Sequence, residues 1–100
     1  MDEKNIATSE VFQTSIRLSI MIILYSHTKT NFSDLQHLLG LTPGNLGHHI
    51  QILENKGFIE YKKQILPPRI KSVIKITEKG KKELKEYLML YKRILESFDW

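Results

Sequence analysis

The residues from Thr42 to Gln51, TPGNLGHHIQ, combine small and hydrogen-bonding side chains at helical spacing, which suits contact with another molecule better than catalysis. Threonine caps a helix well, and proline loses no hydrogen bond at the first helical position, so we expect a helix to begin here. Gly44 and Gly47 then fall in its first turns, although a glycine weakens a helix by about 1 kcal/mol relative to alanine. We expect these glycines to let a partner approach closely; the alternative is that they accommodate a tight turn against the preceding helix.

The expected helix has one apolar side and one polar side, given a rotation of about 100° per residue. Leu46, Ile50 and Leu53 fall together and are predicted to face the core. The opposite side carries small or polar residues and no large aliphatic one: Gly44, Gly47, His48, Gln51 and Asn55. Such a face fits a helix that lies in the major groove of DNA, with Gln51 and His48 as the expected readers of base edges.

The adjacent histidines His48 and His49 raise the question of a metal site. Neighbouring positions on a helix point about 100° apart, so this pair chelates one ion poorly. The sequence has no cysteine, His27 and His37 are isolated, and the helix has no His-x-x-x-His spacing. We therefore expect no metal and no cofactor, with His49 half-buried in packing and His48 a surface donor.

The sequence contains none of the patterns that catalysis commonly uses. There is no glycine-rich phosphate loop, no nucleophile motif and no metal triad. Acidic residues such as Glu83 and Glu86 have the spacing of charges on a helix surface. The sequence therefore predicts a protein that is not an enzyme.

The charge of the chain is concentrated in its second half. The 100 residues, enough for one domain with a small core, carry a net charge of +4. Eleven basic and four acidic residues lie between Gly57 and Arg93, a net charge of +7, and the remainder sums to −3. This asymmetry favours a polyanionic partner; the alternative is a lysine-rich solvated face.

The apolar run from Ile16 to Tyr25 is predicted to form a buried core helix. It is shorter than the roughly 20 residues that span a bilayer, and it starts too late and contains Arg17, which argues against a signal peptide. We expect the first helix within residues 9–27, either continuous from Ser9 or with a second start at Ser15. With no targeting or membrane segment in the sequence, we expect no membrane contact and a cytoplasmic location.

Residues 31–57 are predicted to form two helices joined by a tight turn. The polar segment HTKTN before them is expected to be a loop. Ser33 or Asn31 caps the short helix SDLQHLLG, Gly40 ends it, and the three residues GLT lead into the second helix. Two helices joined in this way are typical of a helix-turn-helix.

Residues 58–76 are predicted to form a β-hairpin, and residues 77–98 a long helix. FIEYKK and IKSVIKIT are rich in β-branched and aromatic residues, and the second alternates. The intervening QILPPR is expected to be a basic loop that its paired prolines stiffen. Thr77 is the expected cap of the last helix, whose first turn tolerates Gly80.

The order of these elements resembles a known family. The stretches FSDLQHLLGLTPGNLGHHIQILENKGFIEY and RIKSVIKITEKGKKEL resemble the small winged-helix transcriptional regulators of the MarR/ArsR kind, especially short archaeal-type ones. Those families carry a pattern like L-T-P-G-N-L, then L-E-x-x-G, a basic wing and T-x-x-G. The resemblance covers residues 16 to about 95. It implies a mostly helical α+β fold, a winged helix-turn-helix with a small β-hairpin wing and N- and C-terminal dimerisation helices.

The expected partner is double-stranded DNA, contacted from three places. The recognition helix is predicted to contribute Thr42, Pro43, Gly44, Asn45, Gly47, His48 and Gln51, and its first-turn N–H groups can meet a phosphate. The wing is predicted to place Lys62, Lys63, Arg69 and Lys71 on the backbone or in a minor groove. Lys29 and Ser33 are predicted to touch the DNA backbone. Where the family usually shows R-P-R-T in the wing, this sequence has RIKS, and a solvated hairpin tip is the alternative.

The last helix carries more apolar surface than one small domain can cover. In the resembled families terminal helices build a homodimer, which implies a dimer interface formed by Tyr87, Leu88, Tyr91, Ile94, Leu95 and Phe98. A two-fold dimer would place two recognition helices about 34 Å apart. The alternative is that the helix folds back on its own domain.

Three functional interpretations follow, and they belong to different classes. The first is a sequence-specific transcriptional regulator that binds DNA as a homodimer. The alternatives are a winged-helix module that docks another protein and a non-specific architectural DNA-binding protein. A small-molecule effector is compatible with the first, although no residues in the sequence define a pocket for it.

Overall fold

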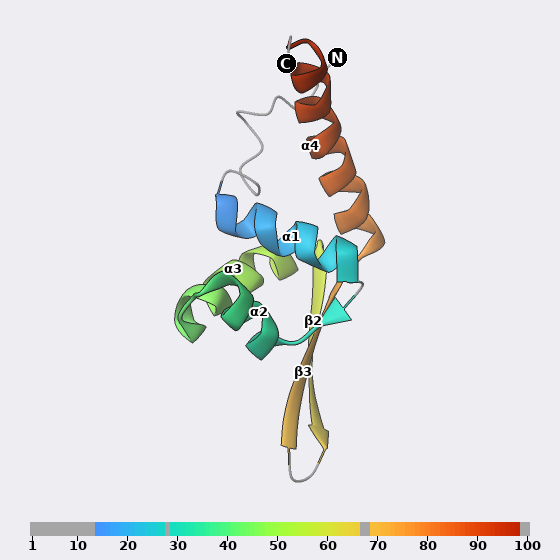
Figure 1. Cartoon of the computed structure of the whole chain (residues 1–100). Helices are drawn as coiled ribbons and strands as arrows, with labels where there is room; N and C mark the ends of the chain where they lie inside the picture. Colours follow the sequence, from blue (N-terminus) through green and yellow to red (C-terminus); the bar gives the residue numbers. More distant parts are fainter. Residues whose placement is uncertain (1–13, 28, 67–68, 99–100) are drawn as a thin grey trace.

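The fold is mostly helical, with a small antiparallel sheet, as the sequence predicts. The computed structural model describes residues 14–27, 29–66 and 69–98. The elements are α1 (Ser15–His27), β1 (Lys29–Thr30), α2 (Phe32–Leu39), α3 (Pro43–Asn55), β2 (Ile59–Leu66), β3 (Arg69–Ile76) and α4 (Glu78–Glu96). Helix α4 and the β2–β3 hairpin extend from the centre in opposite directions, which gives the molecule dimensions of 54 × 29 × 22 Å (Figure 1).

The predicted signals for the start and end of the helices are confirmed. Asn31, one of the two candidates, caps α2 by accepting a hydrogen bond from the Asp34 N–H over 2.7 Å. Gly40 ends α2 in the left-handed conformation, with φ of 65°. The hydroxyl groups of Thr42 and Thr77 cap α3 and α4 in the same way. Each cap of this kind contributes about 1 kcal/mol.

The β2–β3 hairpin is longer than the sequence suggests. Strands β2 and β3 pair over eight residues each, from Ile59 opposite Ile76 to Leu66 opposite Arg69. The prediction of QILPPR as a loop is therefore wrong for all but residues 67–68, which lie outside the described residues. The physical reason is the β-branched pair Ile65 and Ile70, which favours a strand on both sides of the prolines.

A short third strand also replaces part of the predicted polar loop HTKTN. Lys29 and Thr30 form β1 and pair with Lys75 and Ile74, so the sheet order is β1-β3-β2. A strand of two residues is too short to show alternation, which explains why the sequence suggests a loop. Its pairing covers the outer edge of β3 near the domain centre.

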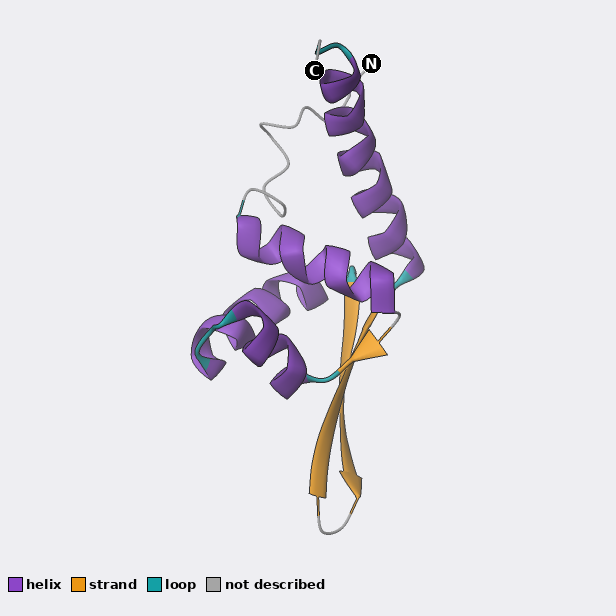
Figure 2. Ribbon diagram, in the orientation of Figure 1, coloured by secondary structure: helices purple, strands orange, loops and turns teal. Residues whose placement is uncertain are grey.

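The core lies where α1 crosses α3 and the base of the hairpin (Figure 2). The apolar run of α1 supplies three fully buried side chains, which confirms its prediction as a core helix. Among the residues whose burial the structure describes, the buried apolar ones are Ile20, Met21, Leu24, Leu35, Leu46, Ile50, Leu53, Phe58, Ile59, Ile74, Ile76, Leu84 and Tyr87. Burial of a large apolar side chain contributes about 1.5–3 kcal/mol, so this core fixes α3 relative to the hairpin.

Gly80 is a packing requirement rather than a tolerated residue, which corrects the sequence interpretation. A β-carbon at this position would collide with the backbone carbonyl oxygen of Phe58 and lie 3.0 Å from Cγ1 of Ile76. The absence of a side chain lets the first turn of α4 pack directly on the chain that enters β2. This contact sets the direction in which α4 leaves the domain.

Two further predictions concern the first helix and the membrane. Helix α1 begins at Ser15, the second of the two expected starts, whereas a start near Ser9 lies outside the described residues. Across residues 14–27, 29–66 and 69–98, no helix combines the length and apolar character that a membrane span requires.

Candidate nucleic-acid interface

Helix α3 turns one side to the core and the other to solvent, as its sequence predicts. Leu46, Ile50 and Leu53 are buried. The opposite side is exposed and polar or small, with Gly47 half-buried at its margin: Gly44, Asn45, His48, Gln51 and Asn55 are the exposed residues. This face combines groups that donate and accept hydrogen bonds with a backbone that is poorly shielded by side chains.

Nothing in the described part of the chain packs against the two glycines of α3. A β-carbon at Gly44 or at Gly47 would meet no other atom within 4 Å among the described residues. The alternative of a tight turn against the preceding helix therefore lacks the contact that it needs. The glycines thus weaken the helix without relieving a collision with the other described residues.

The N-terminus of α3 offers fewer free N–H groups than its sequence suggests. The Asn45 N–H donates to Oγ1 of Thr42 over 3.2 Å, and Pro43 has no N–H. Of the expected first-turn donors, Thr42 and Gly44 therefore remain for a phosphate. The positive end of the helix dipole adds to the attraction at this point.

The two histidines of α3 differ in environment. His48 is exposed, as predicted, whereas His49 is 7% exposed and so more deeply buried than expected. Their rings meet edge to face, with centroids 5.5 Å apart. Nη1 of Arg17 in α1 lies 3.2 Å from Nδ1 of His49. Burial lowers the pKa of His49 below its usual 6.5, and the positive charges of Arg17 and His48 lower it further.

Two neighbouring exposed lysines of strand β2 lie on opposite faces of the hairpin. Successive residues of a strand alternate between faces, so Lys62 and Lys63 diverge. Lys63 stands opposite Ser72, whose hydroxyl accepts a hydrogen bond from the Phe32 N–H at the start of α2 over 2.8 Å. The Lys63 face is therefore the one turned toward the helices, and the Lys62 face is turned away from them.

The two other predicted wing cations lie near the end of the hairpin. Lys71 is paired with Gln64, and Arg69 with Leu66. Along β3 these two positions fall on the other face of the hairpin from Ser72. Of the residues predicted to touch the DNA backbone, Ser33 is exposed in the first turn of α2, and Lys29 lies in β1.

An apolar surface covers the outer side of α4 and continues onto α1. Of the predicted interface residues, five are between 37% and 55% exposed: Leu88, Tyr91, Ile94, Leu95 and Phe98. Three residues that the sequence interpretation omitted adjoin them, namely Ile22 and Tyr25 of α1 and Met89 of α4. We call these eight residues the apolar α1–α4 face. A face of this extent on a small domain is typical of an interface.

Tyr87 differs from the other predicted interface residues. It is 6% exposed and belongs to the core of its own chain. Its hydroxyl lies 3.1 Å from that of Tyr91, and the two rings meet edge to face. Burial, together with the Tyr91 hydroxyl, raises the pKa of Tyr87 to about 12. A neutral tyrosine thus links the core to the outer side of α4.

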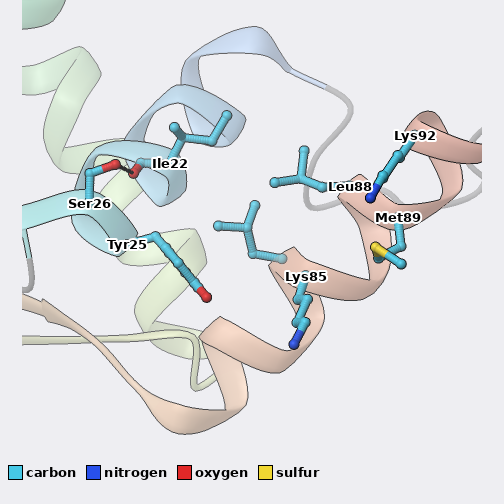
Figure 3. A pocket seen from close by; sticks show the side chains of 8 residues that line it. Ile22, Tyr25, Ser26, Lys85, Leu88, Met89 and Lys92 are labelled. Carbon is cyan, nitrogen blue, oxygen red and sulfur yellow. Dashed lines mark hydrogen bonds between the residues drawn. The ribbon is translucent and has the colours of Figure 1, made fainter. Parts of the chain in front are cut away.

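A groove of about 320 Å³ separates α1 from the middle of α4 (Figure 3). Ile22 and Tyr25 approach it from α1, and Leu88 points into it from α4. Its remaining lining residues are Ser26, Leu84, Lys85, Met89 and Lys92. The groove is apolar, with two lysines on the α4 side, and it opens within the apolar α1–α4 face.

Metal ligands do not gather in the part of the chain that the structure describes. Among those residues no three histidine or carboxylate side chains come together in a way that could hold an ion. The sequence-based reasoning on the histidine pair and the missing cysteines therefore remains the argument for expecting no metal.

Sequence reasoning missed the role of Arg17, although a signal for it was present. An arginine inside an otherwise apolar helix needs a polar partner when it is half-buried, and His49 is such a partner. By contrast, nothing in the sequence identifies Ser72 as the acceptor for the α2 backbone, because that contact spans 40 positions.

A helix-turn-helix with a polar outward helix, followed by a basic hairpin, defines the winged-helix class of DNA-binding proteins. Comparison with known families agrees, because the model for the winged helix DNA-binding domain matches residues 16–95. The chain belongs to this family of DNA-binding transcriptional regulators. The predicted resemblance to winged-helix regulators of the MarR kind is thereby confirmed.

Individual relatives support the same assignment. The chain is 40% identical to the uncharacterised protein MJ0432 of Methanocaldococcus jannaschii over 79 residues, which are 79% of this chain and 86% of that protein. It is similar to a transcriptional regulator homologue of Pyrococcus horikoshii OT3, with a TM-score of 0.88, 37% identity and coverage of 95% of this chain and 94% of that one. The YusO protein of Bacillus subtilis shares the fold, with a TM-score of 0.76 at 20% identity over 87% of this chain and 61% of that one. The family and the Pyrococcus homologue are described as DNA-binding and regulatory, not as enzymes.

Proposed function

We propose that the protein is a cytoplasmic, sequence-specific transcriptional regulator that binds double-stranded DNA as a homodimer. Helix α3 enters the major groove, and the β2–β3 hairpin contacts the backbone or an adjacent minor groove. The observation that carries the proposal is the open space beside the α3 backbone, where a β-carbon at Gly44 or Gly47 would meet none of the described side chains within 4 Å.

Some residues of α3 are proposed to position the helix on the DNA backbone, and others are proposed to recognise the bases. Thr42, Pro43, Gly44 and Asn45 lie at the exposed start of the helix, where the N–H groups of Thr42 and Gly44 are suited to one phosphate. His48 and Gln51 follow on the exposed face and can hydrogen-bond to base edges. Gly47 lies between these two groups and permits the backbone to approach the groove floor.

The hairpin and the chain before α3 supply positive charge around the reading helix. Lys63 is on the hairpin face turned toward the helices, so we assign it a phosphate beside α3. We assign Arg69, near the end of the hairpin, to the minor groove, and Lys62 and Lys71 to the outer backbone. Lys29 and Ser33 are proposed to hold phosphates on the other side.

The homodimer is proposed to form through the apolar α1–α4 face. Most of its exposed side chains belong to α4, which extends from the domain on the side opposite the hairpin (Figure 1). A two-fold axis through this surface leaves both hairpins and both α3 helices free. The two reading helices would then meet half-sites about one turn, or 34 Å, apart.

The test of DNA binding is a titration against two duplexes at two salt concentrations. One duplex comes from the region upstream of the protein's own gene and the other is random, both at 50 and 200 mM salt. We expect tighter binding to the upstream duplex and a steep loss of affinity with salt, about 10³-fold for six phosphate contacts. Equal, salt-sensitive binding to both would favour an architectural protein, and no binding at 50 mM salt would favour a protein-docking module.

The test of the dimer is the mass in solution. Sedimentation of the wild type should give twice the mass of one chain, and Leu95→Glu should give one chain, because it places a charge in the apolar α1–α4 face. Lys62→Glu, an exposed change on the hairpin, is the matched control and should remain dimeric. A wild type that sediments as one chain at high concentration would refute the proposed dimer.

A further inference from the structure

A hydrogen bond joins the recognition helix to α1 inside the molecule. The Arg17 side chain reaches from α1 to α3, and its Nη1 lies 3.2 Å from Nδ1 of His49. His49 is buried and Arg17 is half-buried, so water competes poorly for this bond. Neither residue is on the exposed face of α3, so their effect on a ligand of that face is one of positioning.

The bond requires a particular protonation state of His49. A guanidinium group only donates hydrogen bonds, so Nδ1 of His49 must be the acceptor and the ring proton must be on Nε2. Protonation of Nδ1 would remove the acceptor and bring two positive charges to within about 3 Å of each other. The same contact that attracts α3 to α1 in the neutral state would then repel it.

The groups around His49 favour the neutral state at pH 7. Burial lowers the pKa of His49 below 6.5, and the charges of Arg17 in α1 and His48 in α3 act in the same direction. The residues that the hairpin buries in the core, Ile59, Ile74 and Ile76, are apolar and contribute no opposing charge. The neutral His49 ring therefore contributes its full stabilisation of the fold above pH 6.5. This stabilisation is lost as the pH falls through the lowered pKa of His49.

We propose that Arg17 and His49 form a pH-sensitive tie that fixes the recognition helix against α1 while His49 is neutral and releases it when His49 is protonated. This inference extends the proposed function, because released α3 presents its reading face less precisely to DNA. Acidification then weakens DNA binding.

The tie is tested first without DNA, by NMR titration of the wild type from pH 8 to 5. The His49 ring should titrate below pH 6.5, and backbone amides of α3 should shift with the same midpoint. In Arg17→Gln, which keeps a hydrogen-bonding group but no charge, the His49 midpoint should rise. An unchanged His49 midpoint, or α3 amides that do not follow it, would overturn the proposal.

DNA affinity on the upstream duplex, at pH 7.5 and at about one pH unit below the His49 midpoint that NMR gives, tests the consequence. The wild type should lose about tenfold in affinity on acidification, or about 1.4 kcal/mol. His49→Asn places an amide oxygen near the position of Nδ1 and does not titrate, so it should keep its affinity. His48→Asn, the matched change on the exposed face, should lose about as much on acidification as the wild type.

The outcomes separate the tie from the proposed function. If DNA affinity falls equally with pH in the wild type and in His49→Asn, the tie does not control DNA binding. If His49→Asn does not fold, Arg17→Gln takes its place and should show a smaller pH dependence than the wild type. If no variant binds DNA at pH 7.5, the proposed function and its pH dependence fall together, and the NMR titration alone decides whether α3 is released.

Discussion

Replacement of Gly47 by alanine should make the free protein more stable and its complex with DNA weaker. A β-carbon at this position meets no atom within 4 Å, so the substitution adds no collision inside the chain. Gly47 is in the body of α3, where alanine is favoured over glycine by about 1 kcal/mol. For a domain of about 100 residues this gain corresponds to a rise in Tm of about 4–8 °C.

The DNA complex should respond in the opposite direction. If the backbone at Gly47 lies against the groove floor, an added methyl group forces a separation, for which we expect about tenfold weaker binding, or 1.4 kcal/mol. Gly47→Glu adds a negative charge facing the phosphates and should abolish binding while the helix keeps its stability. Both effects follow from one property of the site, the open space beside the α3 backbone.

Two assays on the same preparation measure the opposed changes. Thermal unfolding, at one fixed protein concentration because a dimer's Tm depends on it, gives the stability. Fluorescence anisotropy on the upstream duplex gives the Kd. A more stable Gly47→Ala protein with unchanged affinity would show that this face does not meet DNA, and a lower Tm would show that the space beside Gly47 is occupied.

Three further predictions concern α4 and the hairpin. Gly80→Ala should lower stability by about 2 kcal/mol in thermal unfolding, because the new methyl group meets the Phe58 carbonyl, which no rotamer change can move; an unchanged Tm would contradict the packing. Lys63→Ala should weaken DNA binding and reduce the slope of log affinity against log salt by about 0.9 per site. Lys62→Ala, on the opposite face of the hairpin, should change both the affinity and the slope less. Equal effects of the two substitutions would mean that both faces contact DNA. Arg69→Ala should weaken binding without a change in Tm, and equal affinity would remove Arg69 from the interface.

Local signals in the sequence were sufficient for most of the framework. Caps and helix ends depend on residues within three or four positions of one another, so Thr42, Thr77 and Gly40 could be assigned correctly. The apolar periodicity of α1 and α3 likewise identified the sides that face the core. For the candidate interface, this was enough to define the exposed face of α3.

Features that depend on distant parts of the chain could not be predicted in the same way. The pairing of β1 with β3 joins residues more than 40 positions apart, and the collision that requires Gly80 involves a carbonyl group 22 positions earlier. The division of Lys62 and Lys63 between two faces followed from strand alternation, but which face meets the helices needed the contact of Ser72 with Phe32. Tyr87 was assigned to an interface because the apolar stripe of the last helix does not show, from sequence alone, how many of its residues pack against the helix's own domain.

Because the contact between Gly80 and Phe58 holds α4 near its base, a small change of angle there displaces the far end of the helix by a larger distance. Residues 81–96 of α4 extend for about 24 Å beyond this contact. A tilt of about 10° at the base would therefore move the far end by about 4 Å, because displacement grows with the length of the helix. In the proposed dimer, small substitutions at this junction would change the separation of the two reading helices more than substitutions in the interface itself. The spacing of the half-sites would then be tuned at the base of α4, far from any base pair.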